Sequence, residues 1–296
     1  MVTRVSLLLI VIVISGCAVL KKETTKGNPP GTVQINDTLF IDRTEVANVH
    51  WREYLFYLFD VETGEDNYQK ALPDTSVWNK FGQRIDTLRK TDTLIITSSV
   101  NNPLTEYYFR HPMFNIYPVV GIRYEQAVEF CKWRTFVVNL GIYMDENNLK
   151  NHKEHLNDSF PIKIYYRLPT MEEWEMIAKG NLNEQEFPYG YKDVYYEWKN
   201  KQFKMFNCIF PDDKPKIHDP HSPDDQIYTV DCKANFPNSY GTYNMIGNLA
   251  EMVSEPGIAK GGSFVDKLDS CKIAIDKYYD GPQAWLGFRC VAIKLK

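Results

Sequence analysis

Apolar residues recur at helical spacing in three stretches of the chain. The first, residues 45–59, follows Thr44, a residue able to cap a helix N-terminus. The second begins extended at Pro118 and takes helical spacing from about Tyr124 to residue 139. The third covers residues 171–179. We therefore expect three main helices separated by long connections.

The third stretch carries signals at both ends. Thr170-Met-Glu-Glu173 is a capping-box pattern, in which the Thr170 hydroxyl accepts from the Glu173 amide and the Glu173 carboxylate reaches back to Thr170. Gly180 is the type of residue that commonly ends a helix. The pattern predicts a helix over Met171–Lys179.

Shorter apolar runs predict strands at residues 33–43, 162–166 and 285–293. Residues 181–231 are loop-like and rich in aromatic residues, Pro and Asp. Residues 61–117 also lack strong periodicity, and a connection of that length is often a functional surface. The aromatic run Tyr107–Phe109 within it suits a binding surface and a core equally well.

The amino terminus has the pattern of an export signal. Arg4 precedes the apolar run Val5–Ile14, which is too short for a membrane span and is followed by small residues. Ile14-Ser-Gly-Cys17 looks like a bacterial lipobox, in which Cys17 is lipidated and becomes the first mature residue. The alternative is cleavage elsewhere, with Cys17 incidental.

This pattern predicts a domain order and a location. Residues 1–16 form the signal peptide, residues 17–32 a lipid-anchored flexible tether and residues 33–296 one domain, with an insertion at about 61–117. Ala18 after the cysteine suggests the outer membrane. We expect a protein of the cell envelope that faces the periplasm or the surface, held to the membrane through its lipid.

Composition narrows the classes of partner. The hydrophobic content of 44% and aromatic content of 14% are enough for a sizeable core in 296 residues. Nucleic-acid binding requires a basic face, and the net charge of −4 gives no sign of one. We expect no nucleic-acid partner.

A turn-rich segment at residues 235–264 has the oxygen donors of a hard-cation site. Side-chain oxygens of Asn244 and Glu251, with the carbonyls of Gly247 and Leu249, can supply four of the roughly six to eight oxygens that Ca²⁺ prefers. The alternative is a polar turn in which Asn244 and Asn248 satisfy local backbone groups.

Five blocks carry a resemblance to the sulfatase-modifying-factor family, whose best-known members are formylglycine-generating enzymes. Together they span nearly everything after residue 38. The blocks are Phe40–Val46; Pro118–Gly121 with Ala127–Trp133; Tyr166–Thr170 with Glu173 and Trp174; Tyr240–Asn248 with Glu251; and Gly261–Ser263 followed by Leu286–Cys290.

The resemblance implies a fold class. We expect an α+β, loop-rich, formylglycine-generating-enzyme-like domain related to C-type-lectin-like architecture. Within the family, the block Asn248-Leu-Ala-Glu251 is similar to that of the gliding-motility lipoproteins of the J and K type.

The resemblance also places the family's copper chemistry on this chain. Catalytic members hold Cu(I) with two cysteines after Gly-Gly-Ser, and soft thiolates select that ion. The first of these cysteines corresponds to Asp266 and the second to Cys271, while Ser263 corresponds to a serine near bound oxygen. A carboxylate is a hard ligand, so we expect the copper site to fail.

Calcium and a disulfide are further implications of the resemblance. The family pattern assigns calcium to the set around Asn244 and Glu251, and to a second set. The second set is Asn207, Cys208, Asp225 and Ile227. The family's disulfide falls on Cys131 and Cys290.

The other cysteines leave alternatives open. Cys208 and Cys232 can pair, which would leave Cys271 alone, and an odd count of five in the exported chain leaves at least one thiol free or bonded outside it. All five can also be reduced, buried residues.

Three functions follow from these observations. The first is a non-catalytic, membrane-anchored scaffold or binding module in a cell-envelope protein complex, with structural calcium. The second is a copper-dependent formylglycine-generating oxidase acting on a sulfatase cysteine. The third is a glycan- or peptide-binding module using the 61–117 insertion and the cleft of the copper site.

Overall fold

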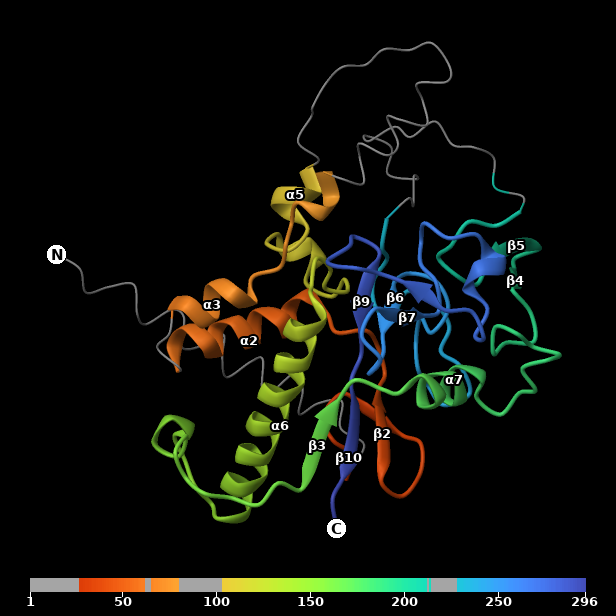
Figure 1. The fold of residues 1–296 in the computed structure, drawn as a ribbon. Helices are drawn as coiled ribbons and strands as arrows, with labels where there is room; N and C mark the ends of the chain where they lie inside the picture. Colours follow the sequence, from red (N-terminus) through yellow and green to blue (C-terminus); the bar gives the residue numbers. More distant parts are fainter. Residues whose placement is uncertain (1–26, 62–64, 80–102, 212, 214–227) are drawn as a thin grey trace.

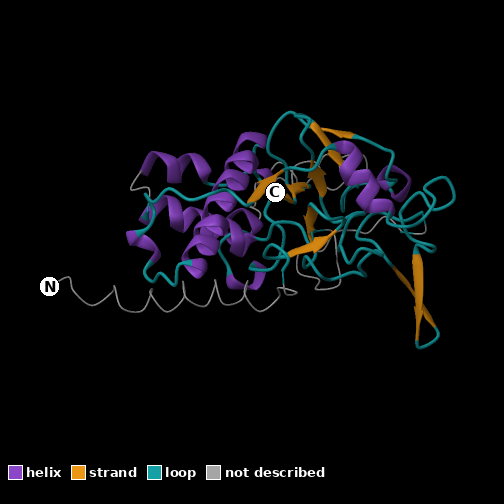
Figure 2. Cartoon of the chain, turned by 90° about the horizontal axis from the view of Figure 1, so that it is seen from below, coloured by secondary structure: helices purple, strands orange, loops and turns teal. Residues whose placement is uncertain are grey.

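The computed structural model describes residues 27–61, 65–79, 103–211, 213 and 228–296. Most of the helical segments gather on one side of the molecule, whereas short strands, loops and helix α7 (Met171–Lys179) lie on the other (Figures 1 and 2). Among the described helices, none combines the length and the apolar character needed to cross a membrane. The arrangement is the expected α+β class.

A four-stranded antiparallel sheet joins the two ends of the domain. Its order is β1 (Thr32–Gln34), β2 (Leu39–Asp42), β10 (Val291–Lys294) and β3 (Ile164–Arg167). The strand predicted at residues 33–43 is two strands, because the Asn36 side chain accepts from the amides of Thr38 and Leu39 and closes a turn.

A second four-stranded sheet has the order β8 (Lys277–Tyr278), β7 (Ile258–Lys260), β6 (Ala250–Met252) and β9 (Leu286–Phe288). Strands β6 and β9 run parallel. The strand predicted at residues 285–293 is therefore β9 and β10, in different sheets. Arg289 lies between them and is fully buried.

The helices are α2 (Asn48–Asp60), α3 (Glu65–Ala71), α5 (Pro103–Tyr107), α6 (Tyr124–Glu146) and α7 (Met171–Lys179), with 3₁₀ turns at Pro112–Phe114, His152–Glu154 and Leu268–Cys271. The capping box of α7 is confirmed: Glu173 N donates to Thr170 Oγ1 at 3.2 Å, and Thr170 N donates to a Glu173 oxygen at 2.9 Å. The predicted start of α6 at Tyr124 is also confirmed.

Helix α2 starts later than the sequence predicts. Its N-cap is Ala47, whereas the Thr44 hydroxyl bonds the carbonyl of Glu45. The reason is tertiary: Val46 N donates to Phe288 O at 2.9 Å, and Ala47 bridges Pro118, so this segment is extended.

An aromatic core joins α2 and α6. Trp51 stacks on Phe130 with ring centroids 5.3 Å apart, and Phe288 meets both rings edge-on. The described part of the 61–117 insertion contributes to the interior: Tyr108 and Phe109 are buried, whereas Tyr107 is 47% exposed. The aromatic run is therefore mostly core.

A separate hairpin projects from the strand-rich side (Figure 2). It pairs β4 (Tyr195–Trp198) with β5 (Lys201–Lys204). The sequence pattern predicts a loop over residues 181–231, so this prediction is wrong for the two paired strands.

Candidate functional site

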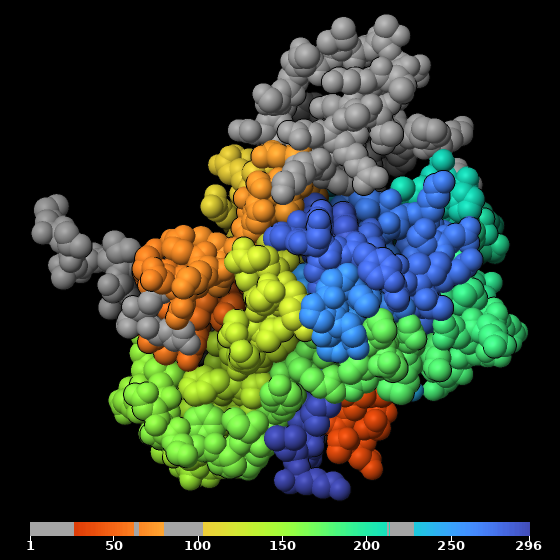
Figure 3. Space-filling model, in the orientation of Figure 1, coloured from red at the N-terminus to blue at the C-terminus, as the bar shows by residue number. Residues whose placement is uncertain are grey.

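The Gly261–Gly262 turn lies where catalytic members of the resembled family have their copper site. Both glycines have positive φ angles, of 86° and 63°. A Cβ on Gly262 would lie 2.4 Å from the Sγ of Cys271, so only glycine allows this cysteine to pack beneath the turn. Cys271 is fully buried there. The carboxy-terminal part of the chain covers much of the upper face of the molecule, and its last residues lie apart at the lower end (blue in Figure 3).

Asp266, at the position of the missing copper cysteine, belongs to a polar network. Ser263 Oγ donates to Asp266 Oδ2 at 2.6 Å, and Lys277 Nζ forms an ion pair with the same oxygen. Lys277 also donates to Ser263 Oγ at 3.2 Å and lies 3.8 Å from the centre of the Trp285 ring. The Asp266 carboxylate, the Ser263 hydroxyl and the Lys277 ammonium therefore supply hydrogen-bond partners to one another.

These residues do not fit a two-thiolate Cu(I) site. A soft monovalent ion prefers sulfur ligands, and of the two positions that correspond to the family's copper cysteines only Cys271 carries sulfur. An ammonium beside Asp266 adds repulsion toward any cation. Ser263 and Cys271 are both present and buried, but no second thiolate stands where the family has it.

A different cysteine reaches Cys271. The segment after Cys208 runs beside the loop of Asp266: Ile209 N donates to Asp266 O, and Leu268 N donates to Ile209 O, both at 2.8 Å. The pKa of the Cys208 thiol is raised, first by its hydrogen bond with Cys271 and then by burial. The structure thus brings Cys208 to Cys271.

Cys232 lies elsewhere. It is buried near Asn244, whose side-chain amide donates to its carbonyl at 3.2 Å. Both Cys208 and Cys232 are free thiols in this structure, and their pairing stays an open alternative. Cys131 and Cys290 have their sulfurs 3.5 Å apart in the core, so the family disulfide stays a prediction with the two residues adjacent.

Glu251 is held by a cation from the protein itself. Its oxygens accept from Arg289 Nε at 2.6 Å, Arg289 Nη2 at 2.5 Å and Trp174 Nε1 at 2.7 Å, and the ion pair is fully buried. A carboxylate offers about four lone-pair sites, and three are used. A Ca²⁺ ion at this position would share Glu251 with Arg289.

The rest of the expected calcium set lies in a tight turn. Asn244 and Asn248 both have positive φ, and Asn244 Oδ1 accepts from the side chain of Asn235 at 2.9 Å. Asn248 Oδ1 accepts from Val230 N at 2.8 Å. These contacts are those of a polar turn that satisfies local groups. Gly247 N donates to Gly261 O, and Leu249 is buried, so the turn is joined to the glycine pair.

The second expected calcium set is described in part. Asn207 donates to Tyr228 O at 2.9 Å and to Asn248 Oδ1 at 3.2 Å. Asp225, Ile227 and the lipidation candidate Cys17 lie outside the described residues. Within the described residues, no three or more His, Cys, Asp or Glu side chains gather as a metal site. Calcium therefore remains a prediction.

Glu45 is a central residue that the sequence analysis missed. It is buried beside Glu251 and Arg289, and Asn248 Nδ2 donates to its Oε1 at 2.7 Å. Burial raises the pKa of Glu45 to about 8. An acidic residue directly before the apolar Val46 and Ala47 was the available signal.

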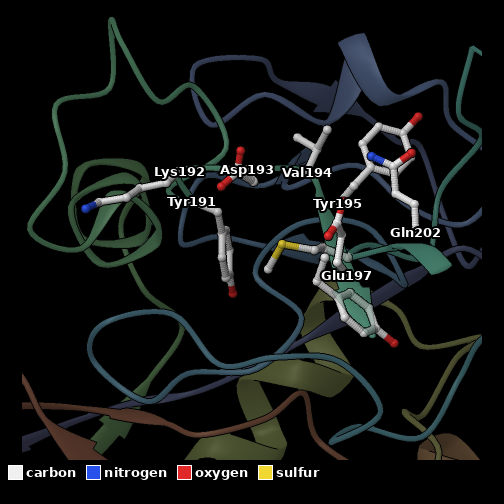
Figure 4. A pocket seen from close by; sticks show the side chains of 9 residues that line it. Tyr191, Lys192, Asp193, Val194, Tyr195, Glu197 and Gln202 are labelled. Carbon is white, nitrogen blue, oxygen red and sulfur yellow. The ribbon is translucent and has the colours of Figure 1, made fainter. Parts of the chain in front are cut away.

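A surface cavity lies at the base of the β4–β5 hairpin. Its volume is about 610 Å³, and residues 191–197 form most of its wall, with Gln202 and Met205 (Figure 4). The wall combines tyrosine rings with the charged groups of Lys192, Asp193 and Glu197. Such a surface can bind a polar ligand with flat faces.

Comparison with known proteins shows the family to which the chain is similar. A family model described as the Sulfatase-modifying factor enzyme 1-like domain matches residues 4–294. The chain is similar to the Chaperone protein LppX of Paenibacillus barcinonensis, with 26% identity over 190 residues, or 55% of this chain and 64% of that protein. A solved structure, Treponema denticola variable protein 1, has a TM-score of 0.41 at 17% identity, over 90% of this chain and 92% of that one.

The similar proteins include one whose name describes an inactive form and one whose name describes an enzyme. The Inactive C-alpha-formylglycine-generating enzyme 2 of Bos taurus is 24% identical over 194 residues, 60% of this chain and 50% of that protein. The Formylglycine-generating enzyme of Thermomonospora curvata is 33% identical over 89 residues, 30% of this chain and 27% of that protein. The chain spans less than two thirds of each of these relatives.

Fold and site define a loop-rich α+β domain with a Gly-Gly-Ser turn and an altered cysteine position. The chain belongs to the sulfatase-modifying factor family.

Proposed function

We propose that this chain is a non-catalytic member of its family, acting as a lipid-anchored scaffold or binding module in a cell-envelope protein complex. The observation that carries the proposal is the network at Asp266. Lys277 and Ser263 occupy its carboxylate, so the position of the first copper cysteine is a hydrogen-bonded ion pair instead of a thiolate.

The relatives are consistent with this interpretation. One is named a chaperone and another an inactive enzyme. The relative named as an enzyme matches only 30% of this chain. We therefore place the formylglycine-generating oxidase as the alternative that an experiment must exclude.

The deciding experiment is mass spectrometry of a cysteine-containing sulfatase-type peptide after aerobic incubation with the copper-treated domain. We expect no conversion to formylglycine. A Cys271→Ser variant is the control. Conversion by the unaltered protein that disappears in this variant would overturn the non-catalytic assignment.

A second variant tests the reason for the inactivity. Asp266→Cys restores a thiol beside Cys271, and we expect Cu(I) affinity to rise by at least about tenfold, since changes outside the ligand set alone alter affinity by about that factor. Asp266→Asn removes the charge without adding sulfur and serves as the matched control. Equal Cu(I) affinity in the unaltered protein and in Asp266→Cys would contradict the argument.

Calcium is part of the proposal as a structural ion. Oxygens of Asn244, Gly247, Leu249 and Glu251 would hold it, with Glu251 shared with Arg289, and it would cross-link turns. Ca²⁺ should then raise the melting temperature relative to chelator, whereas Mg²⁺ should not, because it demands a smaller octahedral site. Equal melting temperatures in Ca²⁺ and chelator would remove calcium from the proposal.

The cavity at the β4–β5 hairpin favours a second candidate, a glycan-binding module. Tyr191, Tyr195 and Tyr196 bring aromatic surface to it, while Asp193 and Gln202 bring hydrogen-bonding groups. Flat apolar faces and hydroxyls of a sugar ring match this combination.

An oligosaccharide array measures this candidate directly. Binding should fall in Tyr196→Ala and persist in Tyr165→Ala, a matched tyrosine that is 45% exposed on β3. Absence of binding to any oligosaccharide, or equal loss in both variants, would reject the cavity as a glycan site. Scaffold function would then be pursued by in-cell cross-linking to membrane proteins.

A further inference from the structure

We propose that Cys208 and Cys271 form a disulfide that cross-links the segment before β6 to the loop of the altered copper site. The inference goes beyond the proposed function, because a scaffold does not require this bond. It is also separate from the disulfide expected at Cys131 and Cys290.

The backbone holds the two segments in fixed register. Ile209 and Lys267 form a parallel bridge, with hydrogen bonds of 2.8 Å from Ile209 N to Asp266 O and from Leu268 N to Ile209 O. Cys208 directly precedes this bridge, and Cys271 ends the 3₁₀ turn that follows it. The Cys208 side chain packs against the hydrophobic cluster that contains Cys271, so the two cysteines share one region of the interior. The raised pKa of Cys208, with the Cys271 side chain as its first cause, agrees with this placement.

The two thiols differ in access. Cys208 is partly exposed, whereas Cys271 is fully buried beneath Gly262. An oxidant from solution therefore meets Cys208 first, and Cys271 is placed to resolve the intermediate. The order of events follows from burial alone.

The oxidant is a small-molecule disulfide such as oxidised glutathione. The thiolate of Cys208 attacks one sulfur of the glutathione disulfide, breaking its S–S bond and releasing one glutathione thiolate. The thiolate of Cys271 then attacks the Cys208 sulfur of the mixed disulfide and releases the second. Two electrons pass from the cysteines to the oxidant, and the two cysteine protons go to the released thiolates.

The bond has a consequence for the altered site. Once oxidised, Cys271 no longer offers a thiolate to a soft metal. The position would then lack both copper ligands of the family, one by substitution and one by oxidation. The cross-link also joins the Asp266 loop to the segment that places Phe210 in the core.

Peptide mapping of the full chain tests the proposal. Protein is reduced, exchanged into oxidised glutathione, trapped with N-ethylmaleimide and digested with trypsin without reductant. Cleavage at lysine places Cys208, Cys232 and Cys271 in three different peptides. We expect a linked Cys208–Cys271 peptide pair that disappears on reduction and is absent from Cys208→Ser and Cys271→Ser.

The control variant is Cys232→Ser, which should retain the linked pair. Oxidation should also raise the urea midpoint of the unaltered protein by more than that of Cys208→Ser, which keeps the Cys131–Cys290 pair. A peptide linking Cys208 to Cys232, or Cys208 fully alkylated while Cys131 and Cys290 become linked, would overturn the proposal. The map of the unaltered protein decides this even if a variant fails to fold.

Discussion

At the residue scale, a buried guanidinium and two buried carboxyl groups lie close together in the interior. Arg289 is bonded through Nε and Nη2 to Glu251, and its Nη1 and Nη2 also donate to the carbonyls of Asp42 and Tyr243. Glu45 lies close enough for its charge to interact with Arg289 and Glu251. With one guanidinium beside two carboxyl groups, a proton on Glu45 avoids an excess negative charge in the interior. This agrees with the raised pKa of Glu45.

Arg289→Met should destabilise the protein by roughly 3–5 kcal/mol, because it leaves Glu251 buried without its counter-charge. Urea denaturation measures this as a lower midpoint. Lys163→Ala is the control, since Lys163 pairs with Glu146 where both side chains are about half exposed, at 43% and 54%. Equal stability losses in the two variants would contradict a buried-charge origin.

The pH dependence of stability follows from Glu45. Burial raises its pKa from 4.5 to about 8, so between these values the unfolded chain releases the proton while the folded chain keeps it. Stability should therefore fall as pH rises from about 4.5 to 8, by at most about 1.4 kcal/mol per unit for this group. Burial of Glu53 raises its pKa to about 7, which acts in the same direction.

Glu45→Gln should flatten this dependence when urea unfolding is followed from pH 5 to 8. Glu146→Gln, at an exposed site, is the control and should keep the unaltered slope. A slope in Glu45→Gln as steep as in the unaltered protein would assign the effect to other groups.

At the element scale, local signals and tertiary contacts compete for each boundary. The capping box of α7 is complete, and Arg167 adds two hydrogen bonds of 2.7 Å to Glu173. Local chemistry therefore fixes this helix. Helix α2 does not begin at the capping residue Thr44, because Glu45 and Val46 are buried in the core beside Phe288.

Thr170→Ala should cost about 1 kcal/mol of stability, because the Glu173 amide loses its acceptor at the N-terminus of α7. Urea denaturation gives the magnitude. Thr170→Ser keeps the oxygen and should lie close to the unaltered protein. If the serine variant loses as much as the alanine variant, the methyl group and not the cap is responsible.

Much of the fold could be predicted at this scale, and less of the site. The starts of α6 and α7 follow from local pattern, and the family blocks fixed the fold class. The division of residues 285–293 between two sheets could not be predicted, since it depends on partners 36 to 254 residues away. For the same reason the approach of Cys208 to Cys271 has no signal in sequence spacing.

At the scale of the whole molecule, both ends of the described domain lie in one sheet. β1 and β2 pair with each other, and β2 pairs with β10, so the chain starts and finishes the domain at the same place. The strands at the two ends support each other. The predicted lipidation residue, Cys17, precedes this sheet in the chain and is the residue to test.

Cys17→Ser should move the protein from the membrane fraction to the soluble fraction of a bacterial host. Acyl chains contribute on the order of 0.8 kcal/mol per buried methylene, so loss of the several chains of a lipoprotein removes the anchor. Detergent phase partition measures the change, and mass spectrometry of the amino terminus of the unaltered protein identifies the acyl groups. Cys232→Ser keeps the lipobox intact and should remain with the membrane. If Cys17→Ser still partitions with detergent, the lipid anchor is wrong and another part of the chain or a partner holds the protein there.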